Sequence, residues 1–217
     1  ISALASLHAL EVLDLCDTKV RDITALQQLT ELRELVLAVN NIADIQAIAS
    51  LNKLEKLNCI RIPATHFAPI AGLQQLRELS IGEANINEIS FLKELKNIEV
   101  LDLNRIPFTD LSPIAGMQKL KRLSLSSTPV EDISALEGLQ NLQTLSLSNS
   151  KVSNIAPLSK LKSLKTLGLQ RSRVVDISPL APLKNLEKLW LQYTAITDLQ
   201  PLSEMANMIV LNLFESK

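Results

Sequence analysis

Apolar residues recur in this chain with a fixed spacing of 22 residues. The stretch Asn185–Ala206 (NLEKLWLQYTAITDLQPLSEMA) aligns without insertion or deletion on the two stretches before it, SLKTLGLQRSRVVDISPLAPLK and NLQTLSLSNSKVSNIAPLSKLK. Its first leucine, Leu186, has a counterpart in every earlier repeat: Leu164, Leu142, Leu120, Ile98, Leu76, Leu54, Leu32 and Leu10. A fixed period of this length predicts a solenoid, in which each repeat packs on its neighbours.

Each repeat has two parts with different apolar spacing. The first part, for example Leu32, Leu35 and Leu37, ends in the alternation typical of a strand with one buried side. Strands one repeat apart must pair parallel and in register, which predicts strands around Leu13, Leu35, Leu57, Leu79, Leu101, Leu123, Leu145, Leu167, Leu189 and Leu211. The second part leaves room for one or two turns of 3₁₀ helix. The predicted fold is therefore an α/β solenoid, with a curved parallel sheet on the concave face and short 3₁₀ or helical segments on the convex face.

The domain organisation follows from the same period. Residues 1–217 are predicted to form a single domain with nine complete repeats over 9–206 and half repeats at 1–8 and 207–217. Terminal repeats normally carry atypical capping sequences, and neither end of this chain does. We therefore expect a fragment of a longer protein whose caps or flanking domains lie outside it.

Composition argues against several classes of partner. Lys plus Arg (22) nearly balances Asp plus Glu (23), so no global field favours nucleic acid or an anionic membrane. The longest apolar runs, such as Leu35–Val39, are too short for membrane insertion. Cys16 and Cys59 lie two repeats apart, roughly 10 Å at the strand spacing, which is beyond disulfide reach. The sequence contains no metal motif and implies no cofactor.

Two polar columns mark the turns. Short polar side chains that can bond turn backbone occupy one column: Thr18, Asn40, Thr128, Ser150, Ser172, Thr194 and Ser216. Ile62, Ala84 and Ile106 interrupt it, so we expect the middle of the array to be irregular. The second column holds Asp22, Asp44, Asp110, Asp132, Asp176 and Asp198. After it, Ser112-Pro113 and Ser178-Pro179 are interpreted as an N-cap residue followed by Pro at the first helical position.

The consensus xLxxLxLxx(T/N/S)x(V/I)x(D/N)IxxLxxLx resembles the 22-residue leucine-rich repeats of the bacterial internalins and the related repeats of the phosphatase-1 regulatory subunit. The resemblance covers the whole chain. It implies a bacterial interaction domain that binds a partner protein on its concave face, such as a host or competitor-cell protein. One alternative is the substrate-recruiting arm of a larger enzyme such as a secreted bacterial ubiquitin ligase. Another is a cytosolic scaffold like the phosphatase regulator.

Charged residues on the strands alternate in sign across the repeats. One column reads Glu11, Arg33, Glu55, Arg77, Glu99 and Lys121; a second reads Glu34, Lys56 and Glu78; a third reads Arg61, Glu83 and Arg105. Residues 22 apart lie side by side in an in-register sheet, so we interpret these charges as lateral ion pairs.

One group of concave residues is left without such an explanation. Trp190 is the only Trp of the chain and lies opposite the buried leucines. Trp, Tyr and Arg dominate binding hot spots, which predicts a partner-binding patch. The patch consists of Gln170, Arg171, Trp190, Gln192, Tyr193, Asn212 and Phe214. The alternative is that Trp190 and Phe214 face a C-terminal cap or a following domain.

Other candidate sites are weaker. A mixed apolar and acidic patch comprises Asp14, Cys16, Asp17, Val36, Ala38 and Val39, and a serine-rich centre offers few anchors. His8 and His66 have no nucleophile or carboxylate implied beside them, so we predict no catalytic residue and no enzymatic activity for this segment. The location stays open between a secreted or cell-surface bacterial protein and an effector in a reducing cytoplasm.

Overall fold

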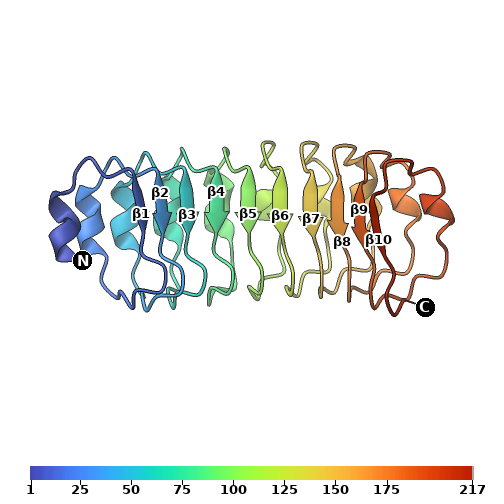
Figure 1. The fold of residues 1–217 in the computed structure, drawn as a ribbon, viewed down its shortest axis with the longest axis horizontal. Helices are drawn as coiled ribbons and strands as arrows, with labels where there is room; N and C mark the ends of the chain where they lie inside the picture. The colour runs from blue at the N-terminus through green and yellow to red at the C-terminus, as the bar shows by residue number, and fades with distance from the viewer. Residues whose placement is uncertain (217) are drawn as a thin grey trace.

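The computed structural model describes residues 1–216 and contains one parallel sheet whose ten strands follow the chain in order (Figure 1). The strands are β1 (Val12–Asp14), β2 (Glu34–Val36), β3 (Lys56–Asn58), β4 (Glu78–Ser80), β5 (Val100–Asp102), β6 (Arg122–Ser124), β7 (Thr144–Ser146), β8 (Thr166–Gly168), β9 (Lys188–Trp190) and β10 (Val210–Asn212). Each is centred on the leucine predicted from the sequence. Repeats are numbered below by their strands.

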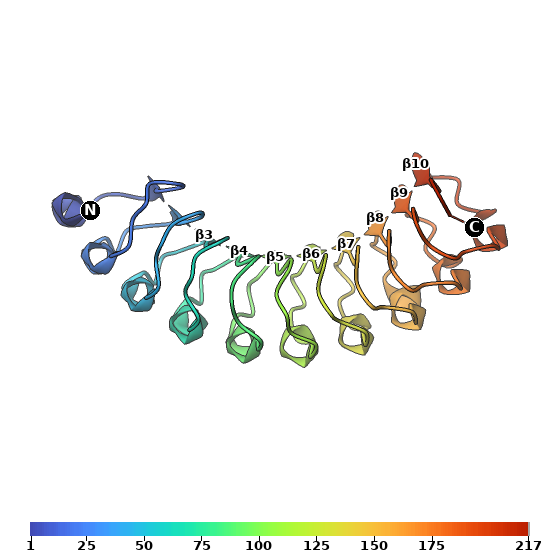
Figure 2. The same ribbon diagram turned by 90° about the horizontal axis from the view of Figure 1, so that it is seen from below.

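A short 3₁₀ helix lies in each of the nine complete repeats and in the N-terminal half repeat, as the spacing predicts. The helices are η1 (Ser2–Ser6), η2 (Thr24–Gln28), η3 (Gln46–Ser50), η4 (Ala68–Gly72), η5 (Ser90–Glu94), η6 (Ser112–Ile114), η7 (Ser134–Leu136), η8 (Ala156–Lys160), η9 (Ser178–Leu180) and η10 (Gln200–Leu202). Viewed from below, the strands line the inner side of an arc and the helices line its outer side (Figure 2). The predicted leucine-rich solenoid is confirmed.

The core is a stack of aliphatic layers between sheet and helices. Leu35, Leu57 and Leu79 pair at the same level of adjacent strands and are almost fully buried. Cys59 takes a leucine position and is also buried, as predicted, and burial raises the pKa of its thiol to about 12. Both cysteines are free. No helix within residues 1–216 is long and apolar enough to span a bilayer.

The polar turn column bonds the backbone as predicted. The hydroxyls of Thr128, Ser150 and Thr194 donate to the carbonyl three residues earlier at 2.6–2.7 Å. Asn40 does more, because its buried Nδ2 donates to the Leu15 carbonyl of the preceding repeat at 2.6 Å. Its Oδ1 accepts the backbone N–H of Val20 at 3.0 Å. These side chains satisfy buried backbone groups that the turn leaves unpaired.

The expected irregularity occurs, and it is confined to the turns. Asn41, Lys151 and Arg173 each donate their backbone N–H to a carbonyl in the turn of the preceding repeat. The four equivalent positions between Asn41 and Lys151 do not make this bond within the described chain: Pro63, Pro107 and Pro129 have no N–H, and the N–H of Asn85 makes no backbone hydrogen bond. The bond is absent again at Ala195. Strand register nevertheless continues unbroken from β1 to β10.

The helix capping predicted at Ser112 and Ser178 is wrong. Ser112 is the first residue of η6, and the residue before it makes no side-chain capping bond. Asp110 provides the cap instead: its Oδ1 accepts the Ser112 backbone N–H at 2.8 Å, and its Oδ2 accepts the Ser112 hydroxyl at 2.8 Å. Asp176 does the same for Ser178. The aspartate column therefore holds the turns, since a carboxylate two residues before a free N–H reaches it without strain.

The third residue beyond the end of each strand has a positive φ, although none of these residues is glycine. The positions are Asp17, Val39, Arg61, Glu83, Arg105, Ser127, Asn149, Arg171, Tyr193 and Glu215, with φ between 52° and 62°. This conformation aims the N–H of Val39 at the Ile60 carbonyl, 2.9 Å away in the next repeat. For an L-residue other than Asn or Asp it costs about 1–2 kcal/mol. This conformation persists because it lets the turn continue the backbone hydrogen bonds between adjacent repeats.

We predict that Val39→Asn stabilises the protein. Val39 is β-branched, 42% exposed and held at φ 59°, whereas Asn adopts this conformation readily. Chemical denaturation should show a gain of about 1 kcal/mol in the free energy of unfolding. The reciprocal variant Asn149→Val at the same position of repeat 7 should lose at least as much, and stabilisation by both variants would contradict the role given to backbone conformation.

Candidate functional site

Lateral ion pairs account for most concave charges, as predicted. Arg33 bridges Glu11 and Glu55, Glu99 bridges Arg77 and Lys121, and Glu83 bridges Arg61 and Arg105, at 2.6–3.8 Å. Lys56 pairs with Glu34 at 2.8 Å. Of the predicted neighbours, only Glu55–Arg77 and Lys56–Glu78 form no ion pair within residues 1–216. Such exposed pairs contribute little stability individually, but they occupy groups that would otherwise face a partner.

The predicted C-terminal patch contains a row of stacked side chains at the turns after β8, β9 and β10. The Arg171 guanidinium carbon lies 4.4 Å from the centroid of the Tyr193 ring. Tyr193 meets Phe214 edge to face with centroids 5.9 Å apart. Arg171 and Tyr193 occupy equivalent positive-φ positions one repeat apart, which places them side by side. The row is exposed, Tyr193 by 42% and Phe214 by 60%.

Trp190 lies apart from this row, on the last residue of β9. Its register neighbours are Gly168 on β8 and Asn212 on β10, so small side chains flank the half-buried indole. Within residues 1–216 it has no aromatic pair. The Asn212 Oδ1 accepts the Phe214 backbone N–H at 3.1 Å, which connects the strand to the aromatic row. The patch is thus two adjoining elements: the indole on the strands and the stacked row at the turns.

Two glutamines of the patch have an unsatisfied oxygen. Oε1 of Gln170 and Oε1 of Gln192 are buried with no hydrogen-bond partner. A Cβ added at Gly168 would lie 3.1 Å from the Gln170 Oε1, so this glycine makes the space that the amide fills. A buried acceptor without a donor is costly.

Asp102 at the centre of the concave face is a feature that the column pattern did not single out. It is half-buried beside Gly82, where a Cβ would lie 3.4 Å from its Oδ1. Burial raises the pKa of the Asp102 carboxyl, opposed by the backbone N–H of Asn104, which donates to Oδ1 at 2.9 Å. It forms no ion pair among the described residues. Its place beside a glycine in a serine-rich region is the sequence signal that could have identified it.

The two weaker predicted regions bond internally. In the N-terminal patch, Asp14 accepts the Cys16 backbone N–H at 2.8 Å; Ala38 is buried, whereas Cys16 and Val39 are exposed. In the serine-rich centre the Ser146 hydroxyl lies 2.7 Å from that of Ser126 and 3.1 Å from that of Ser148. Hydroxyls that bond one another offer few groups to a partner.

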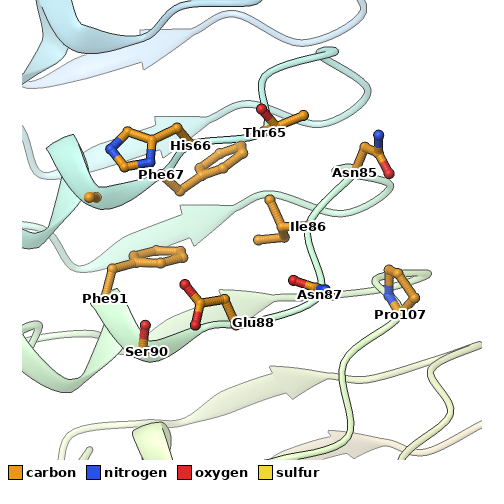
Figure 3. A pocket seen from close by; sticks show the side chains of 11 residues that line it. Thr65, His66, Phe67, Asn85, Ile86, Asn87, Glu88, Ser90, Phe91 and Pro107 are labelled. Atoms are coloured by element: carbon orange, nitrogen blue, oxygen red, sulfur yellow. The ribbon is translucent and has the colours of Figure 1, made fainter.

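A hollow of about 410 Å³ opens off the sheet, where repeats 3, 4 and 5 meet, and we call it the His66–Phe91 hollow (Figure 3). Phe67 and Phe91 stack along it with centroids 6.0 Å apart. Ile86 faces the same hollow, and Asn85 and Pro107 lie on the side of the hollow opposite the two phenylalanines. Sequence reasoning predicted irregular turns here but not the hollow, because its depth depends on how two phenylalanines from different repeats pack.

Neither histidine forms a catalytic arrangement in the described residues. The His8 Nδ1 lies 3.3 Å from the Gln28 carbonyl oxygen, and His66 lines the hollow without a hydrogen bond to a nucleophile or carboxylate. No three His, Cys, Asp or Glu residues within 1–216 converge as metal ligands.

Comparison with known proteins identifies the family. A family model described as "Leucine Rich repeats (2 copies)" matches residues 118–160 and 140–182. Internalin C2 of Listeria monocytogenes is 33% identical over 86% of this chain and 83% of its own, with a TM-score of 0.83. The chain therefore belongs to the bacterial 22-residue, internalin-like leucine-rich repeat family.

Two longer structures extend this likeness. An internalin (inlF) of Listeria monocytogenes is 31% identical over 97% of this chain, with a TM-score of 0.94. A leucine-rich repeat protein of Leptospira interrogans is 27% identical over 97%, with a TM-score of 0.90. The chain spans 62% of the first and 56% of the second. No curated protein sequence matches significantly. Leucine-rich repeat folds of this type are generally protein-interaction modules.

We predict opposite pH effects for two aspartates. The Asp102 pKa is higher in the folded protein than in the unfolded chain. Above about pH 4 the unfolded chain therefore loses this proton more readily than the folded protein, and the free energy of unfolding falls as pH rises. Asp102→Asn keeps the Oδ1 acceptor but removes the charge. Its free energy of unfolding should therefore exceed that of the parent at neutral pH, with the gain shrinking in acid.

Asp110→Asn is the control. The N–H and hydroxyl of Ser112 lower the Asp110 pKa, so the carboxylate stabilises the fold above about pH 4 and this contribution is lost as pH falls. That variant should be less stable than the parent at neutral pH and match it in acid. Urea denaturation across a pH series checks both signs, and a loss of stability in Asp102→Asn at neutral pH would contradict the burial argument.

Proposed function

We propose that this chain binds a partner protein on the C-terminal part of its concave face, through the patch Gln170, Arg171, Trp190, Gln192, Tyr193, Asn212 and Phe214. The observation that carries the proposal is the row Arg171–Tyr193–Phe214, an exposed aromatic cluster fixed by stacking contacts of 4.4 and 5.9 Å. Side chains already held in place lose little conformational entropy when a partner binds.

The chemistry of the patch constrains its partner. Tyr193 and Phe214 offer apolar area, and Arg171 adds a cation that forms no ion pair among the described residues. The matching surface is an apolar or aromatic side chain flanked by a carboxylate, since a charged group completes the ion pair as the rings lose water. The Oε1 atoms of Gln170 and Gln192 are buried without a hydrogen-bond partner, so rotation of either amide toward N–H groups of the partner would gain a hydrogen bond.

The rest of the concave face supports the choice of this end. Ion pairs occupy most of the alternating charges of repeats 1 to 6, although Glu78 and Asp102 form none among the described residues, and the serines of repeats 6 and 7 bond one another. Repeats 8 and 9 also contain a lateral ion pair, Lys165–Glu187. Repeats 8 to 10 differ in presenting the exposed side chains of Arg171, Tyr193 and Phe214, which stack on one another. Hot spots concentrate in such rigid, desolvatable residues, whereas the surrounding contacts mainly exclude water.

The test compares proteins captured by the wild-type chain with those captured by Trp190→Ala, followed by affinity measurement on the purified partner. We expect Trp190→Ala and Tyr193→Ala each to weaken binding by roughly 30-fold, the effect of removing a hot-spot aromatic. Val175→Ala is the matched control, because Val175 is 59% exposed but outside the patch, and it should bind like wild type.

Circular dichroism and denaturation must first show that each variant is folded. Unchanged affinity in folded Trp190→Ala and Tyr193→Ala would overturn the proposal. Binding that is lost in Val175→Ala but kept in Tyr193→Ala would move the interface to another face of the solenoid.

A further inference from the structure

The His66–Phe91 hollow lies at two turns that lack the aspartate-to-backbone hydrogen bond found in most other repeats. In seven repeats an Asp or Asn of the aspartate column accepts the backbone N–H two residues later, at 2.7–2.9 Å. In repeats 3 and 4 this column holds His66 and Glu88, and neither makes that bond in the described chain. Both exceptions line the hollow.

Loss of the cap leaves the polar side chains around the hollow without intramolecular partners. Thr24, Ser112, Ser134 and Ser178 each donate their hydroxyl to the aspartate of their own repeat. Ser90 is the equivalent of Ser112, and its hydroxyl has no such bond within residues 1–216. Six exposed polar side chains line the hollow, and none of them makes a side-chain hydrogen bond or ion pair within residues 1–216: Thr65, His66, Asn85, Asn87, Glu88 and Ser90.

The floor of the hollow is apolar, and it is formed by residues that differ from those at the equivalent positions of the other repeats. Phe91 occupies a position that is alanine or proline in the other repeats, for example Ala47 and Pro113. Phe67 replaces the usual Ile or Leu, and Ala64 beside it replaces a larger aliphatic residue. The Phe67 and Phe91 rings therefore stack, Phe67 buried and Phe91 half-buried, beneath polar side chains that make no hydrogen bond within the described residues.

The lining selects a class of ligand. No Lys or Arg contributes to it, which disfavours phosphate and other anions, and its single carboxylate and single imidazole do not form a metal site. Amides, hydroxyls and a carboxylate exchange hydrogen bonds with hydroxyl groups, and aromatic rings pack against C–H faces. A pyranose ring carries both surfaces. The volume of about 410 Å³ is at the small end of ligand pockets and suits one or two sugar units.

We propose that the His66–Phe91 hollow binds a neutral pyranose sugar, with Phe91 against the C–H face of the ring and Asn85, Asn87 and Glu88 bonding its hydroxyls. The site lies off the concave sheet and shares no residue with the C-terminal patch. Either proposal can therefore fail without the other. Proteins often give up a stabilising local feature where a binding site needs the space or the free groups.

The test is saturation-transfer NMR with glucose, galactose, mannose and N-acetylglucosamine, each as the free sugar and as its methyl glycoside. We expect at least one to bind saturably in the millimolar range. Binding of the methyl glycoside would indicate the end of a glycan as the ligand, and binding of the free sugar alone would indicate a free monosaccharide. The absence of binding by every sugar would overturn the proposal.

Three variants locate the site. Asn85→Ala should weaken binding about five-fold or more through loss of a hydrogen bond, and Asn41→Ala, at the same position two repeats away, should not. Glu88→Asp restores the cap to Ser90, so its melting temperature should rise by about 2–4 °C while sugar binding falls. Equal sugar binding by wild type, Asn85→Ala and Glu88→Asp would place the sugar elsewhere and overturn the assignment.

Discussion

Every structural feature of this solenoid depends on in-register pairing of residues 22 positions apart. The ladder extends beyond the strands: the Leu15 N–H donates to the Val36 carbonyl and the Asp17 N–H to the Ala38 carbonyl, at 2.9 and 3.0 Å. Each repeat contacts only its neighbours, and these two ladder bonds recur between every pair of adjacent repeats. The strained conformation after each strand persists for that reason, even where Val39 or Tyr193 occupies it.

Register also decides what the surface can do. Any residue on a strand lies beside its counterparts in adjacent repeats, so alternating charges become ion-paired rows and repeated serines become bonded rows. Such rows fill the concave face with groups that are already paired. We therefore propose that binding sites on this chain consist of departures from the repeat. The aromatic row near Tyr193 is one departure, and the uncapped turns at His66 and Glu88 are another.

The sequence predicts the repeating features well because each is tested many times in one chain. The strand centres, the 3₁₀ helices, the buried Cys59 and the ion pairs around Arg33 all follow from column position. Features that depend on contacts between unlike repeats are harder to predict. The pattern predicts a cap at Ser112, which is wrong, because column position does not show that Asp110 reaches the Ser112 N–H. The half-buried state of Asp102 and the stacking of Phe67 on Phe91 depend on side-chain packing that a column does not encode.

We propose that departures from the repeat at the C-terminal end of the concave face form the protein-binding surface. Amide hydrogen exchange of the chain, with and without its captured partner, tests it most directly. We expect slowed exchange over β9, β10 and the turn residues Gln192, Tyr193 and Phe214, with exchange in the 3₁₀ helices unchanged. Protection confined to helices η1 to η10 on the convex side would contradict it.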